Sequence, residues 1–394
     1  MSHLPSRSRL IPVVVLAGLL GSEPIFSQLG GAPVEARVPF APAPFVSDGR
    51  TRLAYELHLT NFYRNSGTLR LERVEVFAAD ETAPIARHEG ADLANLVVHP
   101  HATPPPSDPL AIAAGLRAVV YMWVTLPPGE RAPAALRHRL LLRTEKDVEH
   151  VMDGVTVDVR NAAPPVLGSP FRDGTWLVAN GPGNHRAHHW GGLLAHNGRV
   201  TVPQRFALDL IRLDADGKAV RGDIKKSANT DWVGYGTEVL AVADGVVRDM
   251  QDGQPDKVPL APNPPTAPTA QAAAGNYVIL DLGGNVFVFY AHFQRGSLTV
   301  RKGDRIRRGH VLGRLGNSGS TNAPHLHLHV GDSFLLETSE GLPFVFRSFE
   351  ALGETTIEHA LGVDSSARPA GAAPRQSEKE LPLDGAVIRF ASRQ

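Results

Sequence analysis

The sequence predicts an all-β protein with two domains. Of the 394 residues, 42% are hydrophobic, which is ample for packed cores, and a chain of this length usually holds about two domains. Short stretches in which apolar and polar residues alternate recur along the chain, as expected of half-buried strands, and no helical period of convincing length appears. A proline-rich stretch at residues 161–170, NAAPPVLGSP, separates two sets of predicted strands, and we place the domain boundary there.

The first domain, residues 35–165, is predicted to be an antiparallel, immunoglobulin-like β-sandwich. In RLAYELHLTN, the residues Leu53, Tyr55 and Leu57 point to one side of a strand, and the polar residues between them mostly point to the other. LRLERVEVFA, RAVVYMWVTL, RHRLLLRT and GVTVDVR show the same alternation. About seven such strands joined by turn-like stretches are typical of a sandwich. Nothing in this domain suggests a catalytic residue, so we expect it to position or dock the domain that follows.

The N-terminus has the order of a secretory signal peptide. MSHLPSRSRL carries two arginines and no acidic residue, LIPVVVLAGLLG is apolar, and SEPIFSQ offers small residues for cleavage. The apolar run is short for a membrane helix, which needs about 20 residues, although an uncleaved signal anchor is the alternative. We expect residues 1–28 to be removed and the mature chain to be periplasmic or extracellular, with no integral membrane segment. At the other end, residues 351–394 are expected to form a partly mobile extension.

Charge and cysteine content narrow the function further. The chain has 40 Lys and Arg against 40 Asp and Glu, so a general affinity for nucleic acid or anionic lipid is not expected. It has no cysteine. Disulfides and thiolate metal sites are therefore excluded, and any metal must be bound by His, Asp or Glu.

The stretch NAPHLHLHVGD is the strongest chemical signal. Its histidines, His325, His327 and His329, are spaced two apart and would share one face of a strand, while Leu326 and Leu328 face the core. A surface strand with histidines facing water is one explanation, but three histidines in five residues after the turn-forming GNSGSTNAP disfavour it. A face of imidazoles also suits zinc, because a catalytic zinc site uses about three protein ligands and keeps one position open for water.

Two further polar residues stand in apolar strands. Asp209 lies in RFALDLIRL, where an acid in so apolar a context is either paired or a metal ligand. His292 ends the strand VFVFYAH, where apolar residues give way to one imidazole. These residues are the other candidates for a metal or catalytic site.

Residues 205–330 resemble the core of the lysostaphin/LytM-type zinc metalloendopeptidases. The resemblance rests on GTEVLAVADGVV, on GNYVILDLGGNVFVFYAHF and on VRKGDRIRRGHVLGRLGNSGSTNAPHLHLHV, which occur in the order of that family. It implies an exported enzyme that cuts the peptide cross-links of bacterial peptidoglycan. It also implies an antiparallel β-sheet metallopeptidase domain, here residues 170–350, with a groove over a bound Zn²⁺.

The resemblance assigns a role to each matching position. Asp209 and His327 match zinc ligands, and His325 and His292 match catalytic histidines that orient or deprotonate the zinc-bound water and stabilise the oxyanion. Zinc lowers the pKa of bound water towards about 7 and polarises the scissile carbonyl. A histidine that titrates near neutrality is suited to move the proton.

One position departs from the family. The family's first zinc ligand is a histidine four residues before the aspartate, and this chain has Arg205 there. A guanidinium stays protonated and cannot bind zinc. One hypothesis is that the upstream stretch NGPGNHRAHHWGG supplies a replacement, with His188 as the first choice and His189 as the second. His329 is a further candidate, or it supports His327.

The other hypothesis is a catalytically degenerate domain. Arg205 would then fill the groove and form a structural salt bridge with Asp209, and the histidines of the upstream stretch would belong to a solvated polar loop. Such a module would bind the cell wall or activate a separate amidase as its partner hydrolase.

Overall fold

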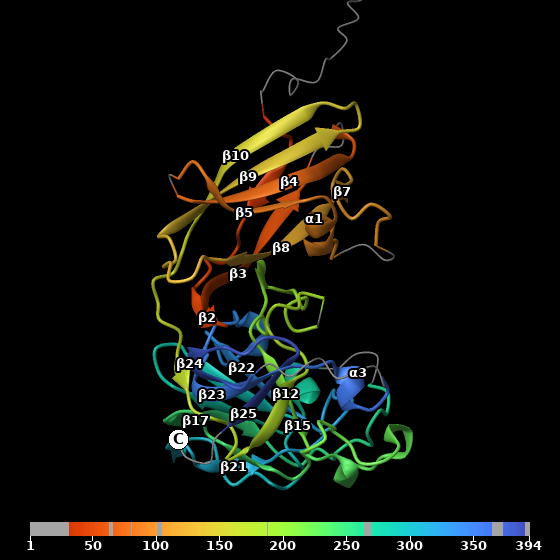
Figure 1. Cartoon of the computed structure of the whole chain (residues 1–394), viewed down its shortest axis with the longest axis vertical. Coiled ribbons are helices and arrows are strands. Elements are labelled where there is room, and N and C mark those ends of the chain that lie inside the picture. The colour runs from red at the N-terminus through yellow and green to blue at the C-terminus, as the bar shows by residue number, and fades with distance from the viewer. Residues whose placement is uncertain are drawn as a thin grey trace, which may run out of the picture.

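The computed structural model describes residues 31–390 apart from 63–65, 80, 101–104, 187, 264–268 and 365–372. The predicted signal peptide, residues 1–28, lies outside the described residues. Two β-domains follow one another along the long axis of the molecule (Figure 1). Within the described part of the chain, no helix has the length and apolar character that a membrane crossing requires.

The N-terminal domain consists of two five-stranded sheets. One has the order β1-β3-β8-β6 with β2 paired to β3, and the other has the order β10-β9-β4-β5 with β7 paired to β4. All pairings within them are antiparallel. The elements are β1 (Glu35–Arg37), β2 (Phe45–Ser47), β3 (Arg50–Thr60), β4 (Leu69–Ala78), β5 (Pro84–Glu89), α1 (Gly90–Leu96), β6 (Val97–Val98), β7 (Ala111–Ile112), β8 (Arg117–Thr125), β9 (Ala135–Thr144) and β10 (Glu149–Asp158).

The two faces of strand β3 are both buried, against different partners. Leu53, Tyr55 and Leu57 alternate into the core between the two sheets of the sandwich, as the sequence predicts. The intervening residues do not face water. Ala54 belongs to the buried apolar cluster of the second domain, and Glu56 beside it is also buried. The sheet that contains β3 and β8 therefore separates two cores, and its outer face is the domain interface.

The second domain is built on one eleven-stranded sheet. Its order is β11-β23-β25-β12-β15-β22-β19-β18-β17-β20, with β24 paired to β23, and two small sheets, β13-β14 and β16-β21, lie beside it. Its strands are β11 (Val166–Leu167), β12 (Gly174–Val178), β13 (Leu194–His196), β14 (Arg199–Thr201), β15 (Leu208–Leu213), β16 (Glu238–Leu240), β17 (Gly245–Gln251), β18 (Tyr277–Asp281), β19 (Phe287–Ala291), β20 (Arg305–Ile306), β21 (Val311–Arg314), β22 (Leu326–Gly331), β23 (Val345–Glu354), β24 (Arg375–Glu380) and β25 (Ala386–Phe390). Short helical turns connect them: η3 (Ile224–Lys226), η4 (Asn229–Asp231), α2 (Ala270–Ala274), η5 (Leu336–Thr338) and α3 (Ile357–Ala360).

The middle of this sheet aligns the candidate residues. Strand β22 lies between β15 and β19, with Asp209 directly opposite His327 on one side and Ala291 opposite His327 on the other. Leu326 and Leu328, which alternate with the histidines, are buried in the main core. The period of two therefore places the imidazoles on the opposite face of the sheet, as the sequence predicts.

The C-terminal segment differs from the partly mobile extension that we expected. β24 pairs with β23, and β25 lies between β23 and β12, so both strands are integral to the sheet. In GAVIRF, the alternating residues Ile388 and Phe390 are buried in the main core. Hydrogen bonding on both sides and two buried apolar side chains fix β25 in place.

Truncation of one core leucine on β22 should destabilise the second domain. We expect Leu328→Ala to lower the free energy of unfolding by about 2–5 kcal/mol, because the deleted methyl groups leave a cavity in a fully packed site. Urea denaturation followed by tryptophan fluorescence would measure this, since Trp176, Trp190 and Trp232 lie in this domain. Val258→Ala, at a position that is 68% exposed, is the control and should stay within about 0.5 kcal/mol of wild type. Equal effects of the two substitutions would contradict this packing.

Candidate metal centre

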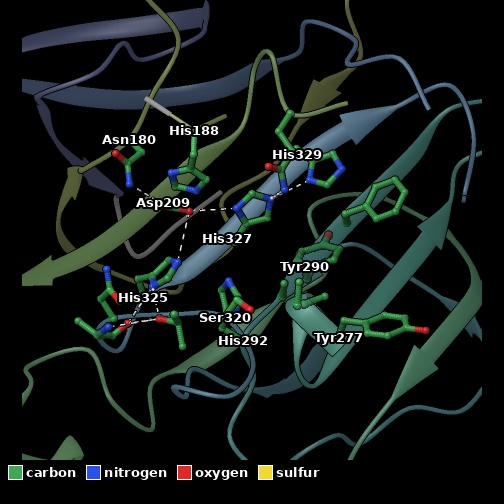
Figure 2. Close-up of a pocket in the computed structure, with 18 of the residues that line it drawn as sticks. Asn180, His188, Asp209, Tyr277, Tyr290, His292, Ser320, His325, His327 and His329 are labelled. Atoms are coloured by element: carbon green, nitrogen blue, oxygen red, sulfur yellow. Dashed lines mark hydrogen bonds and ion pairs between the residues drawn. The ribbon is translucent and has the colours of Figure 1, made fainter. Parts of the chain in front are cut away.

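Three imidazole nitrogens converge on one carboxylate oxygen, Oδ1 of Asp209. His327 Nδ1 lies 3.0 Å from this atom, His325 Nε2 lies 3.3 Å from it and His189 Nε2 lies 3.5 Å from it. Figure 2 shows His325 and His327 directed at Asp209 from strand β22 and the turn before it. The pairing of β15 with β22 makes Asp209 and His327 cross-strand neighbours, and His189 reaches the same point from the preceding loop.

The far nitrogens of two of these rings are held by backbone carbonyls. His325 Nδ1 lies 2.8 Å from the oxygen of Ala323, and His189 Nδ1 lies 3.2 Å from the oxygen of Asn180. A carbonyl oxygen only accepts hydrogen bonds, so each Nδ1 carries a proton and donates it. The Nε2 atom of each ring therefore faces Asp209 with a lone pair, unless it carries a second proton. His189 Nε2 is buried and has no hydrogen-bond partner among the described residues.

Asn180 joins the loop to the carboxylate, a role that no pattern in the sequence predicts. Its side-chain Nδ2 donates to Asp209 Oδ2 over 2.9 Å, while its backbone carbonyl accepts from His189 Nδ1. Strand β12 pairs with β15, and Asn180, the second residue after β12, therefore lies beside Asp209. In the sequence, Asn180 could be noticed only as the first residue of NGPGNHRAHHWGG. Its contact with Asp209 depends on the pairing of β12 with β15, which the local sequence pattern does not specify.

His329 supports His327 from the side away from Asp209. His329 Nδ1 lies 2.8 Å from His327 Nε2, and the His329 ring stacks on Phe289 with centroids 4.3 Å apart. Gln204 Nε2 is also 3.3 Å from His327 Nε2. These contacts leave His327 Nδ1 directed at Asp209. Of the two roles considered for His329, the structure places it where it orients His327.

His292 lies next to His325 through an unusual backbone conformation. It follows the last residue of β19 and has a φ of 68°, a left-handed value that is uncommon outside glycine. Its Nδ1 donates to the carbonyl of Ser318 over 2.8 Å, and its ring centroid is 4.7 Å from that of His325. In the neutral ring the lone pair is therefore at Nε2, and the side chain lines the cavity above the sheet.

The upstream histidines separate into two groups. His188, His189 and Asp209 offer ligand atoms that lie within 4.8 Å of one another; His188 is exposed at the cavity and His189 is buried. His185 turns the other way, and its Nε2 lies 2.6 Å from the carbonyl of Asn95 in the N-terminal domain. The structure therefore brings two of the three upstream histidines to Asp209.

Arg205 does not pair with Asp209, so the salt bridge suggested between these two residues is wrong. Its guanidinium is buried and donates from Nε and Nη2 to Glu56 over 2.9 Å and 2.6 Å. It also contacts the carboxylate of Glu340. Although burial opposes its charge, Glu340 and Glu56 raise the pKa of Arg205, so this residue stays charged and fully paired away from the carboxylate at the site.

Burial and the Asp209 charge set the protonation of the site. Burial lowers the pKa of His189 to about 3 and holds the pKa of His292 well below its usual range. Burial also opposes the ionisation of Asp209, but His189 and His325 outweigh it and lower the pKa of Asp209. Burial acts against His325 as well, yet Asp209 raises the pKa of His325. Near neutral pH, the site therefore holds an ionised carboxylate, a neutral His189 and a His325 that readily accepts a proton.

A cavity of about 640 Å³ lies over these residues. Two separate apolar clusters contribute to its walls, one on the outer face of β18 and β19 and one around β15 and α3. The arrangement is a metal-sized donor set at the floor of a largely apolar groove. The wall residues are Tyr277, Ile279, Phe289 and Phe334 from the first cluster, and Ile211, Trp232, Ile357 and Leu361 from the second.

Part of the second domain is similar in sequence to known peptidases. Residues 229–334 match the model of peptidase family M23. Over 109 residues the chain is 32% identical to the peptidoglycan DD-endopeptidase ShyC of Vibrio cholerae. This alignment covers 27% of this chain and 21% of ShyC. Over 57 residues it is 39% identical to the peptidoglycan DD-endopeptidase ShyA of the same organism, covering 14% of this chain and 13% of ShyA. The chain thus spans about a fifth of the length of ShyC and less of ShyA.

Among solved structures, the catalytic domain of lysostaphin from Staphylococcus simulans is similar at 20% identity and a TM-score of 0.24, covering 42% of this chain and 86% of that domain. The matched range contains His292, His325 and His327, whereas Asp209 and His189 precede it. The chain therefore carries a domain of peptidase family M23, and residues from outside the matched range complete its histidine cluster.

Proposed function

We propose that the chain is an exported zinc metalloendopeptidase that hydrolyses peptide bonds in the cross-links of bacterial peptidoglycan. The observation that carries the proposal is the convergence of three imidazole nitrogens on Asp209 Oδ1. The relatives are named as peptidoglycan DD-endopeptidases, and their substrate lies outside the cytoplasm. The signal-like N-terminus of the sequence is consistent with that location.

The donor set fits Zn²⁺. We assign Asp209, His327 and one histidine of the 188–189 pair as ligands, which gives the mixed imidazole and carboxylate set of catalytic zinc sites. His189 is favoured as the third ligand because its buried Nε2 lone pair faces Asp209 without another partner. His188, the first choice from the sequence, lies on the cavity side of the same group and remains the alternative.

Zinc in this position would polarise the scissile carbonyl and lower the pKa of a bound water. His325 is placed to take the proton of that water at Nε2, because the carbonyl of Ala323 fixes its Nδ1 proton and Asp209 raises the pKa of its ring. His292 Nε2 opens to the same cavity beside His325. We assign His292 to orient the water and to stabilise the oxyanion.

The alternative function is a catalytically degenerate module that binds the wall or activates a partner amidase. In that alternative, a salt bridge from Arg205 would neutralise Asp209. Because Glu56 and Glu340 bind the guanidinium instead, Asp209 keeps its charge for a cation. This contact pattern favours the enzyme over the degenerate module.

Zinc content should report directly on the ligand set. We expect near-stoichiometric zinc in the purified wild-type chain by elemental analysis, and loss of that zinc in Asp209→Ala and His327→Ala. His189→Ala should lose most of it, because a buried lone pair in the donor set disappears. His188→Ala should retain it.

The control for this measurement is His310→Ala, an exposed histidine that lies in the M23 domain away from the cavity lining. A wild-type chain that stays zinc-free even after reconstitution would overturn the metallopeptidase. Loss in His188→Ala with retention in His189→Ala would keep the enzyme but reverse the assignment within the pair.

Substitution of either proposed catalytic histidine should reduce turnover without removing zinc. We expect His325→Ala and His292→Ala to keep zinc and lower the rate of cross-link cleavage by about 10²–10⁴-fold, the usual contribution of a positioned acid or base. Chromatography of the fragments released from purified peptidoglycan would measure the rate, with His310→Ala again as the matched control. Cleavage at the wild-type rate in both variants would rule out these roles.

A further inference from the structure

We propose that the N-terminal domain completes the metal centre and that Glu56 is the positioning residue through which it does so. Glu56 holds the histidine segment, residues 180–190, over Asp209, and thereby sets the affinity for zinc. The inference rests on the proposed function, because it assumes that a histidine of this segment binds the metal.

One buried carboxylate connects both sides of the site. Glu56 Oε1 accepts from Trp190 Nε1 over 2.5 Å and from Arg205 Nε over 2.9 Å, and Glu56 Oε2 accepts from Arg205 Nη2 over 2.6 Å. Trp190 directly follows His189, and Arg205 stands four residues before Asp209. Glu56 on strand β3 therefore fixes the chain next to both members of the His189–Asp209 contact.

The histidine segment needs such anchors because it has no regular structure. Its described residues form neither strand nor helix, so no ladder of backbone hydrogen bonds holds it in place. Its beginning is tied to the second domain, where Gly181 N and Asn184 Nδ2 donate to Asp384 over 2.8 Å and 3.0 Å. These contacts involve residues that precede the ligand candidates His188 and His189.

The end of the segment is tied to the N-terminal domain instead. His185 Nε2 lies 2.6 Å from the carbonyl of Asn95, and the His185 ring stacks on Tyr121 with centroids 5.3 Å apart. The Trp190 indole packs edge-on against Tyr121 and tilted against Trp123, at 5.6 Å and 5.5 Å. His188 and His189 therefore lie between two residues that are both bound to the sandwich.

Glu56 also positions the guanidinium of Arg205. The family has a metal-binding histidine at this position, and this chain has a permanent cation there. Bidentate pairing with Glu56 and contact with Glu340 keep the guanidinium directed away from Asp209. The same carboxylate thus contacts the segment that carries the proposed ligand and the arginine that stands at the family's histidine position.

Zinc affinity of the full chain, measured by competition with a chelator, tests this inference. We expect Glu56→Gln and Trp190→Phe to weaken zinc binding by about 10–100-fold, as changes to residues that orient metal ligands do. Trp190→Phe keeps an aromatic ring and the Arg205 pair, and it removes the donor to Glu56 together with part of the buried indole. The absorption spectrum of the Co²⁺-substituted chain should shift in both variants, which a loss of stability alone would not cause.

The matched control is Glu380→Gln, which removes another buried carboxylate at the domain interface. Glu380 accepts from Asp48 N and Gly49 N over 3.0 Å and 3.2 Å and has no contact with the histidine segment among the described residues. Its zinc affinity and Co²⁺ spectrum should match those of wild type, and thermal unfolding of the metal-free chains would show how far each substitution destabilises the fold.

The possible outcomes distinguish failure of the positioning role of Glu56 from failure of the proposed metallopeptidase function. Wild-type zinc affinity in Trp190→Phe and in Glu56→Gln would overturn the positioning role and leave the metallopeptidase intact, as would equal weakening in Glu380→Gln. If Glu56→Gln does not fold, Trp190→Phe decides the question alone. A wild-type chain that binds no zinc would overturn the proposed function and this inference together.

Discussion

The arrangement of the molecule depends on a buried cluster of three ionisable residues, in which Arg205 contacts Glu56 and Glu340. Its three charges come from strand β3 of the sandwich, from the turn before β15 and from the turn before β23. A charge in a protein interior costs several kcal/mol unless its partners are in place, and removal of one partner of such a pair typically costs about 3–5 kcal/mol. These segments can be buried only together, so the ion pair specifies how the two domains meet.

Apolar packing around the pair makes this arrangement rigid. Ala54, Val119 and Tyr121 from the sandwich belong to the same buried cluster as Leu208 and Leu328 from the sheet of the second domain. The chain therefore has a continuous core across its domain boundary, unlike the more polar and mobile interfaces that are common between domains.

Local pattern in the sequence predicts what depends on a strand's own period. The alternation in RLAYELHLTN, the shared face of His325, His327 and His329, and the all-β class follow from side chains that alternate every residue. The face of β3 that carries Glu56 was expected to be exposed, because a half-polar face normally is. Its burial depends on a partner 149 residues away, and no local period encodes that distance.

The same limit applies to the site. Asp209, His292, His325 and His327 could be named because they stand in short motifs, and the structure brings them together. Asn180 and the preference for His189 could not be found in this way, because they depend on the pairing of β12 with β15 and on which ring the loop turns inwards. The strand pairing of the C-terminal segment was missed for a related reason, since its partners β12 and β23 come from distant parts of the chain.

The shared core also bears on how such a protein can evolve. The proline-rich junction at residues 161–170 is where the chain passes from one set of strands to the next, and it would be the natural point of recombination between genes. A crossover there would separate Glu56 from Arg205 and leave Arg205 with Glu340 as its acidic partner, without the bidentate contact from the sandwich. Substitutions at Glu56 and at Arg205 therefore constrain each other across the domain boundary.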